Sequence, residues 1–293
     1  NDYHYPLARL LLVNNCIYAV EQNHSFHPKV WIIRYEENSA RKRILYRIAV
    51  LSRNISKQNM LEGGIVLEGH KTEASCEKES KEGLIAFLSK FDDENRVVSL
   101  LKNELPYVSF LDTAKMIGGD LAEYAFLPTE GNKFISDFAK SIRQARKIFA
   151  VSPFLGEAQY IQNLLMNKLD YTTIITRKGE NTREFIEKNI ALYYLSEDSK
   201  ADNNNETEKE PDDAGQREYL FDNDELPLHA KIYAVDLGDL HCLYVGSANM
   251  SKNGFEVNTE MMVKITSNTI NFAEVLENVE VFKTSRVRID KVY

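Results

Sequence analysis

The chain has 293 residues, 43% of them hydrophobic, and a formal net charge of −8 at pH 7. These values are typical of a soluble globular protein with one large core or two of ordinary size. Its three cysteines are odd in number and share no ligand-like spacing, which argues against a disulfide framework or a structural zinc site and indicates a reducing, cytoplasmic compartment. The longest apolar run, residues 10–13, is far too short to span a bilayer, so we expect no membrane segment.

The negative charge is concentrated in one segment. Residues 197–218 hold nine acidic and three basic side chains and so supply −6 of the total. The segment has no hydrophobic period and is rich in Asn, Asp, Glu and Lys, which predicts a mobile surface loop. Either it is a plain solvated insertion or it shields a basic cleft. The rest of the chain is nearly neutral, so its charge does not exclude a nucleic-acid partner.

The first half of the chain begins with a predicted pair of strands. Residues 27–35 and 44–54 are rich in β-branched and aromatic residues and flank the polar loop 36–43. Residues 80–91 have a helical apolar period. Only 26 residues precede the first strand, without an initiator Met, so we expect that this half lacks its natural beginning. The Pro- and Gly-containing segment 102–132 is the expected connection to the second half.

The second half alternates helical and strand patterns. Predicted helices at 134–147, 157–169 and 181–189 alternate with short apolar strands at 147–155, 171–177 and 190–196. Two further strands, 229–236 and 241–249, are joined by the short turn 237–240 and predict a hairpin. Helices that alternate with buried strands indicate an α/β layer with a largely parallel sheet.

A sequence motif of the first half recurs in the second. HPKVWIIR begins at residue 27 and HAKIYAVD at residue 229, and each is followed by Ser-x-Asn, an apolar residue, Ser-Lys, and then a Glu before an apolar strand. Two copies with the same order of residue types indicate an ancient duplication. The matched pairs are His27 with His229, Lys29 with Lys231, Ser52 with Ser247, Asn54 with Asn249, Lys57 with Lys252 and Glu62 with Glu260.

These residues resemble the two HKD motifs of the phospholipase D superfamily, H-x-K-x(4)-D followed by G-S-x-N. The second copy is complete, whereas the first has Arg34 in place of the Asp and Leu51 in place of the Gly. The sequence Ser-x-Asn, apolar residue, Ser-Lys, together with an HKD motif that lacks its Asp, is similar to the motifs of tyrosyl-DNA phosphodiesterases and bacterial phospholipase-D-type nucleases. The resemblance implies two lobes, residues 1–115 and 116–293, each a mixed, largely parallel sheet flanked by helices. A pseudo-twofold axis would relate them, and both motifs would form one active site within a single chain.

The repeated lysines and asparagines suit a phosphodiester substrate. A phosphodiester is an anion that repels nucleophiles, so a site without a metal must supply fixed positive charge and hydrogen-bond donors around the phosphoryl oxygens. Lys29, Lys231, Asn54 and Asn249 would do so, and we expect no metal or other cofactor. The hydroxyl groups of Ser52 and Ser247 are expected to add donors.

The two histidines suit a two-step displacement. One imidazole attacks phosphorus while the other protonates the leaving oxygen and later activates water. The resemblance assigns His27 as nucleophile and His229 as general acid, whereas the residues alone leave the order open. A carboxylate on the second ring nitrogen would orient each histidine, and Glu62 and Glu260 are the candidates for that work.

Two features of the first copy remain to be interpreted. Arg34 lies seven residues from His27, so strand alternation turns it away from the histidine face, and we interpret it as a change in strand-end packing rather than a loss of catalysis. Trp31 is either a base-stacking platform or a core residue. The basic loop 41–43 is either a solvated turn or a contact for a phosphate backbone.

Three classes of function follow. The first is a metal-independent phosphodiesterase that cleaves nucleic acid, DNA rather than RNA, as a bacterial restriction or antiphage nuclease. The second is a phospholipid phosphodiesterase or phosphatidyltransferase, which would be expected to have an interfacial apolar helix that the sequence does not display. The third is a non-catalytic pair of lobes that binds nucleic acid or a partner protein, for example an ATPase or helicase subunit.

Overall fold

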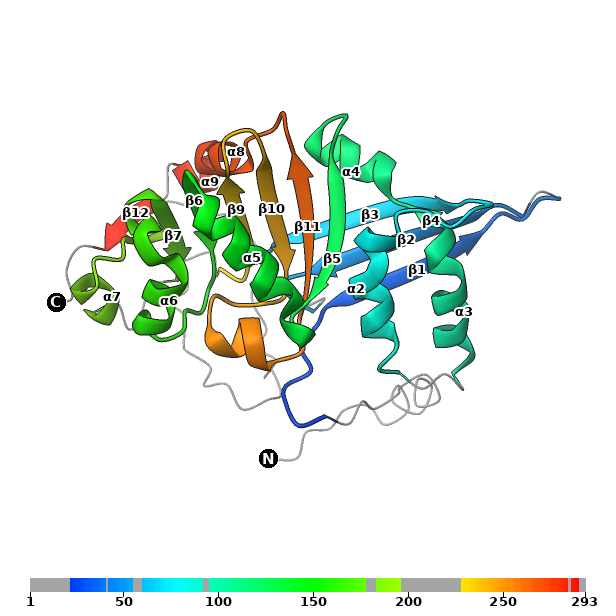
Figure 1. Ribbon diagram of the computed structural model, residues 1–293, viewed down its shortest axis with the longest axis horizontal. Coiled ribbons are helices and arrows are strands. Elements are labelled where there is room, and N and C mark those ends of the chain that lie inside the picture. The colour runs from blue at the N-terminus through cyan, green and yellow to red at the C-terminus, as the bar shows by residue number, and fades with distance from the viewer. Residues whose placement is uncertain are drawn as a thin grey trace, which may run out of the picture.

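The computed structural model contains two β-sheets that share an apolar core, and the strands of the first pass behind one edge of the second in Figure 1. In the first sheet the strands follow the order β1–β2–β3–β4, and every neighbouring pair is antiparallel. The expectation of a largely parallel sheet is therefore wrong for this half. The loop between β1 and β2 is shorter than a parallel crossover, which needs a dozen or more residues. The strands are β1 (Val30–Glu36), β2 (Ile44–Leu51), β3 (Gly64–Lys71) and β4 (Val108–Ser109).

The structure describes only part of the chain, and all statements here refer to that part. Its ranges are 22–40, 42–54, 60–91, 95–177, 183–195, 228–283 and 286–289. The acidic segment 197–218 lies outside the described residues, as do Lys57 and residue 41 of the basic loop.

The second sheet is mixed, in the order β12–β8–β7–β6–β9–β10–β11–β5. Only β6, β7 and β8 run parallel, because helices connect them, and the predicted β9–β10 hairpin is confirmed. The mixed sheet flanked by helices is thus confirmed, with antiparallel pairs more numerous than expected. The strands are β5 (Glu123–Pro128), β6 (Lys147–Val151), β7 (Thr172–Thr176), β8 (Leu192–Leu195), β9 (Ile232–Asp236), β10 (His241–Gly246), β11 (Met261–Ser267) and β12 (Arg286–Ile289).

The helices form where the apolar period predicts them. On α5, the residues Phe134, Phe138 and Ile142 are at most 1% exposed, so the predicted apolar face is buried. The α-helices are α2 (Lys78–Leu88), α3 (Arg96–Glu104), α4 (Leu111–Gly118), α5 (Lys133–Gln144), α6 (Ala158–Leu165), α7 (Arg183–Glu187), α8 (Phe272–Asn278) and α9 (Glu280–Lys283). Shorter turns are η2 (Leu105–Tyr107), η3 (Glu130–Asn132), η4 (Met166–Tyr171) and η5 (Asn253–Val257).

Two apolar cores hold these layers together. The first joins one face of β2 and β3 to residues of α2, β6, β9 and β11, so it fastens the two sheets to each other. The second packs α5 and α6 on the opposite face of the second sheet, against side chains of β9 and β10. The second sheet is therefore buried on both faces, as its nearly continuous apolar strands require.

The segment 102–132 is more than a connection. It contains the end of α3, β4, α4 and β5, and β5 forms an edge of the second sheet. The strands of the first sheet end at Ser109, and those of the second begin at Glu123. The division into residues 1–115 and 116–293 stays a prediction. Within the described ranges, we find no helix with the length and apolarity needed to cross a membrane.

Candidate active site

The two motif copies exchange backbone contacts at their histidines. The N–H of His27 donates to the carbonyl oxygen of Thr259 at 2.9 Å, and the N–H of His229 donates to the carbonyl oxygen of Leu61 at 2.8 Å. Thr259 and Leu61 each immediately precede the matched glutamate of their own copy. Isolated parallel bridges occur at both places. These backbone hydrogen bonds therefore place each histidine beside the glutamate of the other copy.

His27 is oriented by the glutamate of the second copy. Its Nδ1 lies 3.1 Å from Oε1 and 3.3 Å from Oε2 of Glu260. Glu260 is buried, whereas the His27 side chain is 38% exposed. A carboxylate can only accept, so it selects the tautomer with the proton on Nδ1. The lone pair of Nε2 is then free to attack an electrophile.

His229 has a different partner. Its Nδ1 lies 2.8 Å from Nζ of Lys231, which donates to it, so the proton of the neutral ring sits on Nε2. Burial, followed by the positive charges of Lys231, Arg53 and Lys29, lowers the pKa of His229 to about 3. His229 is therefore neutral in the free protein and presents an N–H where His27 presents a lone pair.

The two lysines make the same contact in each copy. Nζ of Lys29 donates to the carbonyl oxygen of His27 at 2.6 Å, and Nζ of Lys231 donates to that of His229 at 2.9 Å. Burial lowers the pKa of Lys29 to about 8 and that of Lys231 well below its ordinary value. Lys231 also donates to the carbonyl oxygen of Ser52 at 3.3 Å, a contact between the two copies. Both ammonium groups are thus held beside the histidine ahead of any substrate.

The hydroxyl oxygens of both serines accept hydrogen bonds from the backbone beside the matched glutamates. Oγ of Ser52 accepts the N–H of Gly63 at 3.0 Å, and Oγ of Ser247 accepts the N–H of Met261 at 3.1 Å. Both serines are fully buried. Gly63 and Met261 each follow the matched glutamate, so the contact is repeated in both copies. The expectation that these hydroxyl groups donate to the phosphoryl oxygens stays a prediction, because a hydroxyl oxygen that accepts a hydrogen bond still has its own proton to donate.

The asparagines and Glu62 are less symmetric. Asn54 is exposed, whereas Oδ1 of Asn249 is buried and has no hydrogen-bond partner in the described part of the chain. Oε1 of Glu62 lies 3.6 Å from Nη1 of Arg53. The backbone brings Glu62 beside His229, but its carboxylate pairs with Arg53, so the expected orienting contact is not formed in this structure.

Two cationic residues escaped the sequence reasoning. Arg53 stands at the variable position of Ser-x-Asn, where the second copy has Ala248, and its charge acts on His229. Arg177 follows β7, and its guanidinium lies 3.7 Å from the ring centroid of Phe154. Its charge lowers the pKa of Lys231, although burial is the larger cause. The asymmetry at Arg53 was visible in the repeat, whereas nothing in the sequence distinguishes Arg177.

Arg34, the first departure from the motif, is explained by its surroundings. Nε of Arg34 donates to Oε2 of Glu104 at 2.8 Å, and the Tyr46 hydroxyl donates to the same oxygen at 2.6 Å. In the second copy, Asp236 occupies the matched position and accepts the N–H of Gly238 at 2.7 Å. Both eighth positions organise the end of a strand, so the interpretation of Arg34 as a packing residue is supported.

Leu51, the second departure, is compensated across the strand pair. Leu51 is paired with Gly64, and the matched Gly246 is paired with Met262, so each pair has one glycine on opposite strands. A Cβ on Gly64 would lie 2.8 Å from the side chain of Leu51. A Cβ on Gly246 would lie 2.1 Å from the carbonyl oxygen of Met261. The glycine of the pair thus lies on β3 in the first copy and on β10 in the second, so a large side chain faces a glycine in both copies.

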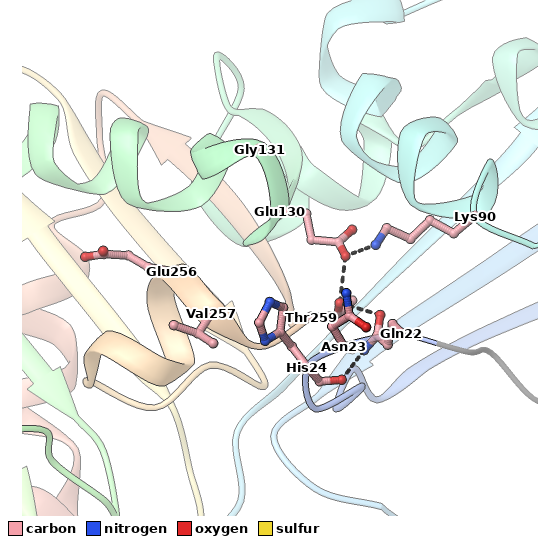
Figure 2. A pocket seen from close by; sticks show the side chains of 9 residues that line it. All are labelled: Gln22, Asn23, His24, Lys90, Glu130, Gly131, Glu256, Val257 and Thr259. Carbon is pink, nitrogen blue, oxygen red and sulfur yellow. Dashed lines mark hydrogen bonds and ion pairs between the residues drawn. The ribbon is translucent and has the colours of Figure 1, made fainter.

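An open pocket of about 950 Å³ has Thr259, the residue before Glu260, among its lining residues. Figure 2 shows the side chains of His24, Glu130 and Thr259 along it, with Lys90 paired to Glu130. Oγ1 of Thr259 donates to Glu130 at 2.7 Å. None of the predicted site residues lines this pocket. In the described part of the chain, no three His, Cys, Asp or Glu side chains are grouped so that they could hold a metal ion.

The chain is similar to known proteins in sequence over one segment and in fold over most of its length. Residues 158–281 match the family described as "Cardiolipin synthase, PLD-like domain". No curated protein matches the sequence. Yeast tyrosyl-DNA phosphodiesterase is 13% identical, with a TM-score of 0.53 over 88% of this chain and 73% of that one. Polyphosphate kinase from Porphyromonas gingivalis is 10% identical, with a TM-score of 0.50, and the match covers 99% of this chain and 39% of that one. NucT from Helicobacter pylori is 17% identical, with a TM-score of 0.38, and the match covers 57% of this chain and 99% of that one.

The fold is like that of yeast tyrosyl-DNA phosphodiesterase, and the resemblance to the phospholipase D superfamily inferred from the two motifs is confirmed. The second half of the chain contains a PLD-like domain, residues 158–281, which includes the complete motif copy.

Proposed function

We propose that this chain is a metal-independent phosphodiesterase that cleaves nucleic acid, DNA rather than RNA, through a phosphohistidine at His27. The observation that carries the proposal is the difference between the two Nδ1 partners. Glu260 leaves His27 with a free Nε2 lone pair, and Lys231 leaves His229 with an Nε2 proton. One nucleophile and one proton donor are what a two-step displacement at phosphorus needs.

In the first step, the phosphodiester binds beside Lys29 and Lys231, whose positive charge offsets that of the phosphoryl oxygens. The anion raises the pKa of His229, whose Nδ1 takes up a proton from solvent and gives up the hydrogen bond from Lys231, so the ring becomes an imidazolium that can donate its Nε2 proton. Nε2 of His27 attacks phosphorus, and the bond from phosphorus to the leaving oxygen breaks. His229 gives its proton to that oxygen, so the first product leaves as an alcohol and the phosphoryl group stays on His27.

In the second step, water attacks the phosphorus of the phosphohistidine. The neutral His229 takes one proton of the water, and the bond between phosphorus and Nε2 of His27 breaks. The products are a phosphomonoester and the regenerated nitrogen lone pair of His27. Glu260 holds the ring through both steps, because its contact is to Nδ1 rather than to the reacting nitrogen.

The choice of nucleic acid rests on two observations. The repeated Ser-x-Asn wording resembles that of nucleases and tyrosyl-DNA phosphodiesterases, and the similarity to the yeast enzyme shows a shared fold. A role in bacterial restriction or antiphage defence, with an ATPase or helicase partner, is part of the proposal. A second candidate, phosphatidyl transfer, is favoured by the description of the family that matches residues 158–281.

The test is cleavage in the presence of a chelator. Plasmid, single-stranded DNA, RNA and cardiolipin vesicles are incubated with the protein and EDTA, alongside His27→Ala and His229→Ala. We expect chelator-resistant cleavage of DNA that both substitutions abolish, and a trapped phosphohistidine in His229→Ala alone. Cleavage that requires Mg²⁺, or that survives both substitutions, would contradict the mechanism. Turnover of the vesicles alone would select the second candidate, and no turnover would favour a non-catalytic binding role.

A further inference from the structure

One face of the first sheet is open to solvent in the described part of the chain. Along β1, Trp31, Ile33 and Tyr35 are 46%, 37% and 41% exposed, and Val66 of the same face is 44% exposed. Cross-strand register sets these residues in adjoining rows on the sheet. The rows are Trp31 with Ala49 and Val66, Ile33 with Arg47 and Glu68, and Tyr35 with Leu45 and His70. We call this surface the β1 face.

Within β1, β2 and β3, the exposed large apolar side chains all lie on this face. On the opposite side of the same strands, Tyr46, Ile48 and Val50 are at most 1% exposed and belong to the core between the sheets. The matching strand of the second copy has no open side, because Tyr233 and Val235 are buried against residues of α5. Large apolar groups side by side in contact with water indicate a binding surface rather than ordinary surface composition.

The β1 face is continuous with the candidate active site. The N–H of Leu51 donates to the carbonyl oxygen of Lys29, so the β1–β2 ladder extends one residue past Val30. Because strand side chains alternate, Lys29, Trp31 and Tyr35 are on the same face. At about 3.3 Å per residue, Tyr35 lies roughly 20 Å from Lys29. Lys29 itself is only 5% exposed, so the open part of the face begins at Trp31, two residues along the chain from Lys29.

The chemistry of the face suits stacked bases. Trp31 and Tyr35 offer flat aromatic surfaces, and the Arg47 guanidinium lies over the Tyr35 ring, 5.7 Å from its centroid. Arg47 also pairs with Glu68, so the middle of the face carries nearly balanced charge. Aromatic and arginine side chains bind unpaired bases by stacking, without reading their sequence. In a duplex the same base faces are already occupied by neighbouring bases.

We propose that the β1 face binds single-stranded nucleic acid, with bases stacked on Trp31 and Tyr35 and the strand leading to the scissile phosphate at Lys29. The direction of the strand rests on the proposed function, whereas stacking on the face does not. The occupant is a nucleic acid rather than a lipid surface, because the aromatic groups lie on the flat of a sheet and do not protrude from a helix or loop.

Trp31 is the only tryptophan of the chain, so its fluorescence reports on this face alone. The protein with His27→Ala, which does not turn over, is titrated with oligo(dT), oligo(rU) and a duplex of equal length. We expect red-shifted emission that acrylamide quenches in the free protein, and saturable quenching by the single strands. Tyr35→Ala should weaken binding about fivefold or more, the usual cost of one stacked base. Tyr171→Ala removes a tyrosine that is 59% exposed on η4 and should change nothing.

A second readout separates this proposal from the proposed function. In the active protein, Trp31→Ala should slow cleavage of oligonucleotides about fivefold or more and leave cleavage of bis(4-nitrophenyl) phosphate unchanged. If no substrate is cleaved but Trp31 is still quenched by single strands, the surface stands and the proposed function fails.

Several results would overturn the surface proposal. Equal quenching by the duplex would remove the argument from unpaired bases. Emission protected from acrylamide would show that another segment or a second copy covers the face, and sedimentation would tell the two apart. A response to anionic lipid vesicles and not to oligonucleotides would assign the face to a membrane surface.

Discussion

Nδ1 of His27, in the first motif copy, lies 3.1 Å from Oε1 of Glu260, in the second. The two residues are 233 positions apart in the sequence, and the contact is supported by the backbone bond from His27 to Thr259. Neither copy alone contains both His27 and the glutamate that orients it. The site therefore depends on the packing of the two sheets against each other.

Glu260→Gln tests this contact. The amide keeps the shape of the side chain but removes the charge that selects the Nδ1-protonated ring of His27. We expect kcat for the small substrate bis(4-nitrophenyl) phosphate to fall on the order of 10- to 100-fold, the usual cost of losing a partner that orients a functional histidine. KM should change little, because Glu260 is assigned no substrate contact. A matched loss in Glu62→Gln would argue against the asymmetry of the two copies.

The buried His229 predicts how stability depends on pH. Burial lowers its pKa from 6.5 to about 3, so between these values the unfolded chain binds a proton that the folded chain does not. Stability contributed by this group is present above about pH 6.5 and is lost as the pH falls toward 3. Urea denaturation at about pH 5 and pH 7, above the range of ordinary carboxyl groups, should give a smaller difference for His229→Gln than for the original chain. An equal difference would contradict the depressed pKa.

Arg53→Ala copies the alanine of the second motif copy into the first. Removal of the Arg53 charge should raise the pKa of His229, although the value should stay below 6.5 because burial is the larger cause. The substitution also removes the group 3.6 Å from Glu62, which is then available to His229. NMR titration of the His229 ring protons measures the change. Arg43→Ala, at an exposed pair with Glu37, is the control and should leave the titration unchanged.

Arg34→Asp restores the acid that the family motif has at this position. Since Arg34 donates to Glu104 and Glu36, an aspartate there would set three carboxylates together. We expect a loss of about 1–3 kcal/mol of unfolding free energy and no gain in activity. Chemical denaturation and an assay with bis(4-nitrophenyl) phosphate measure the two effects. Higher activity in the variant would show that Arg34 impairs catalysis.

Gly246→Ala tests the exchanged glycines. Its new Cβ would meet the carbonyl oxygen of Met261, which belongs to the backbone, so we expect a loss of about 1–3 kcal/mol of unfolding free energy. Gly64→Ala is the matched control, because its Cβ would meet only the end of the Leu51 side chain, which can move. Equal losses in thermal denaturation would contradict this account of Leu51.

The sequence by itself determined several of the helices and strands and showed which polar residues are repeated. The helix at α5, the β9–β10 hairpin and the strands that follow each histidine all depend on local periods of apolar residues, which a sequence displays directly. The duplication identified His27, Lys29, His229 and Lys231, because a repeat exposes matched residue types whatever the fold does with them. Their catalytic roles and the division between the two lobes stay predictions.

The tertiary structure alone decided how the pieces combine. It pairs His27 with Glu260 while Glu62 pairs with Arg53, uses the serines to hold strand ends, and makes the first sheet antiparallel. It also leaves Trp31 in contact with solvent, whereas the sequence allowed either a core or a surface position for this residue. These outcomes depend on contacts between residues far apart in the chain. Local spacing carries no information about which distant partner a side chain will meet.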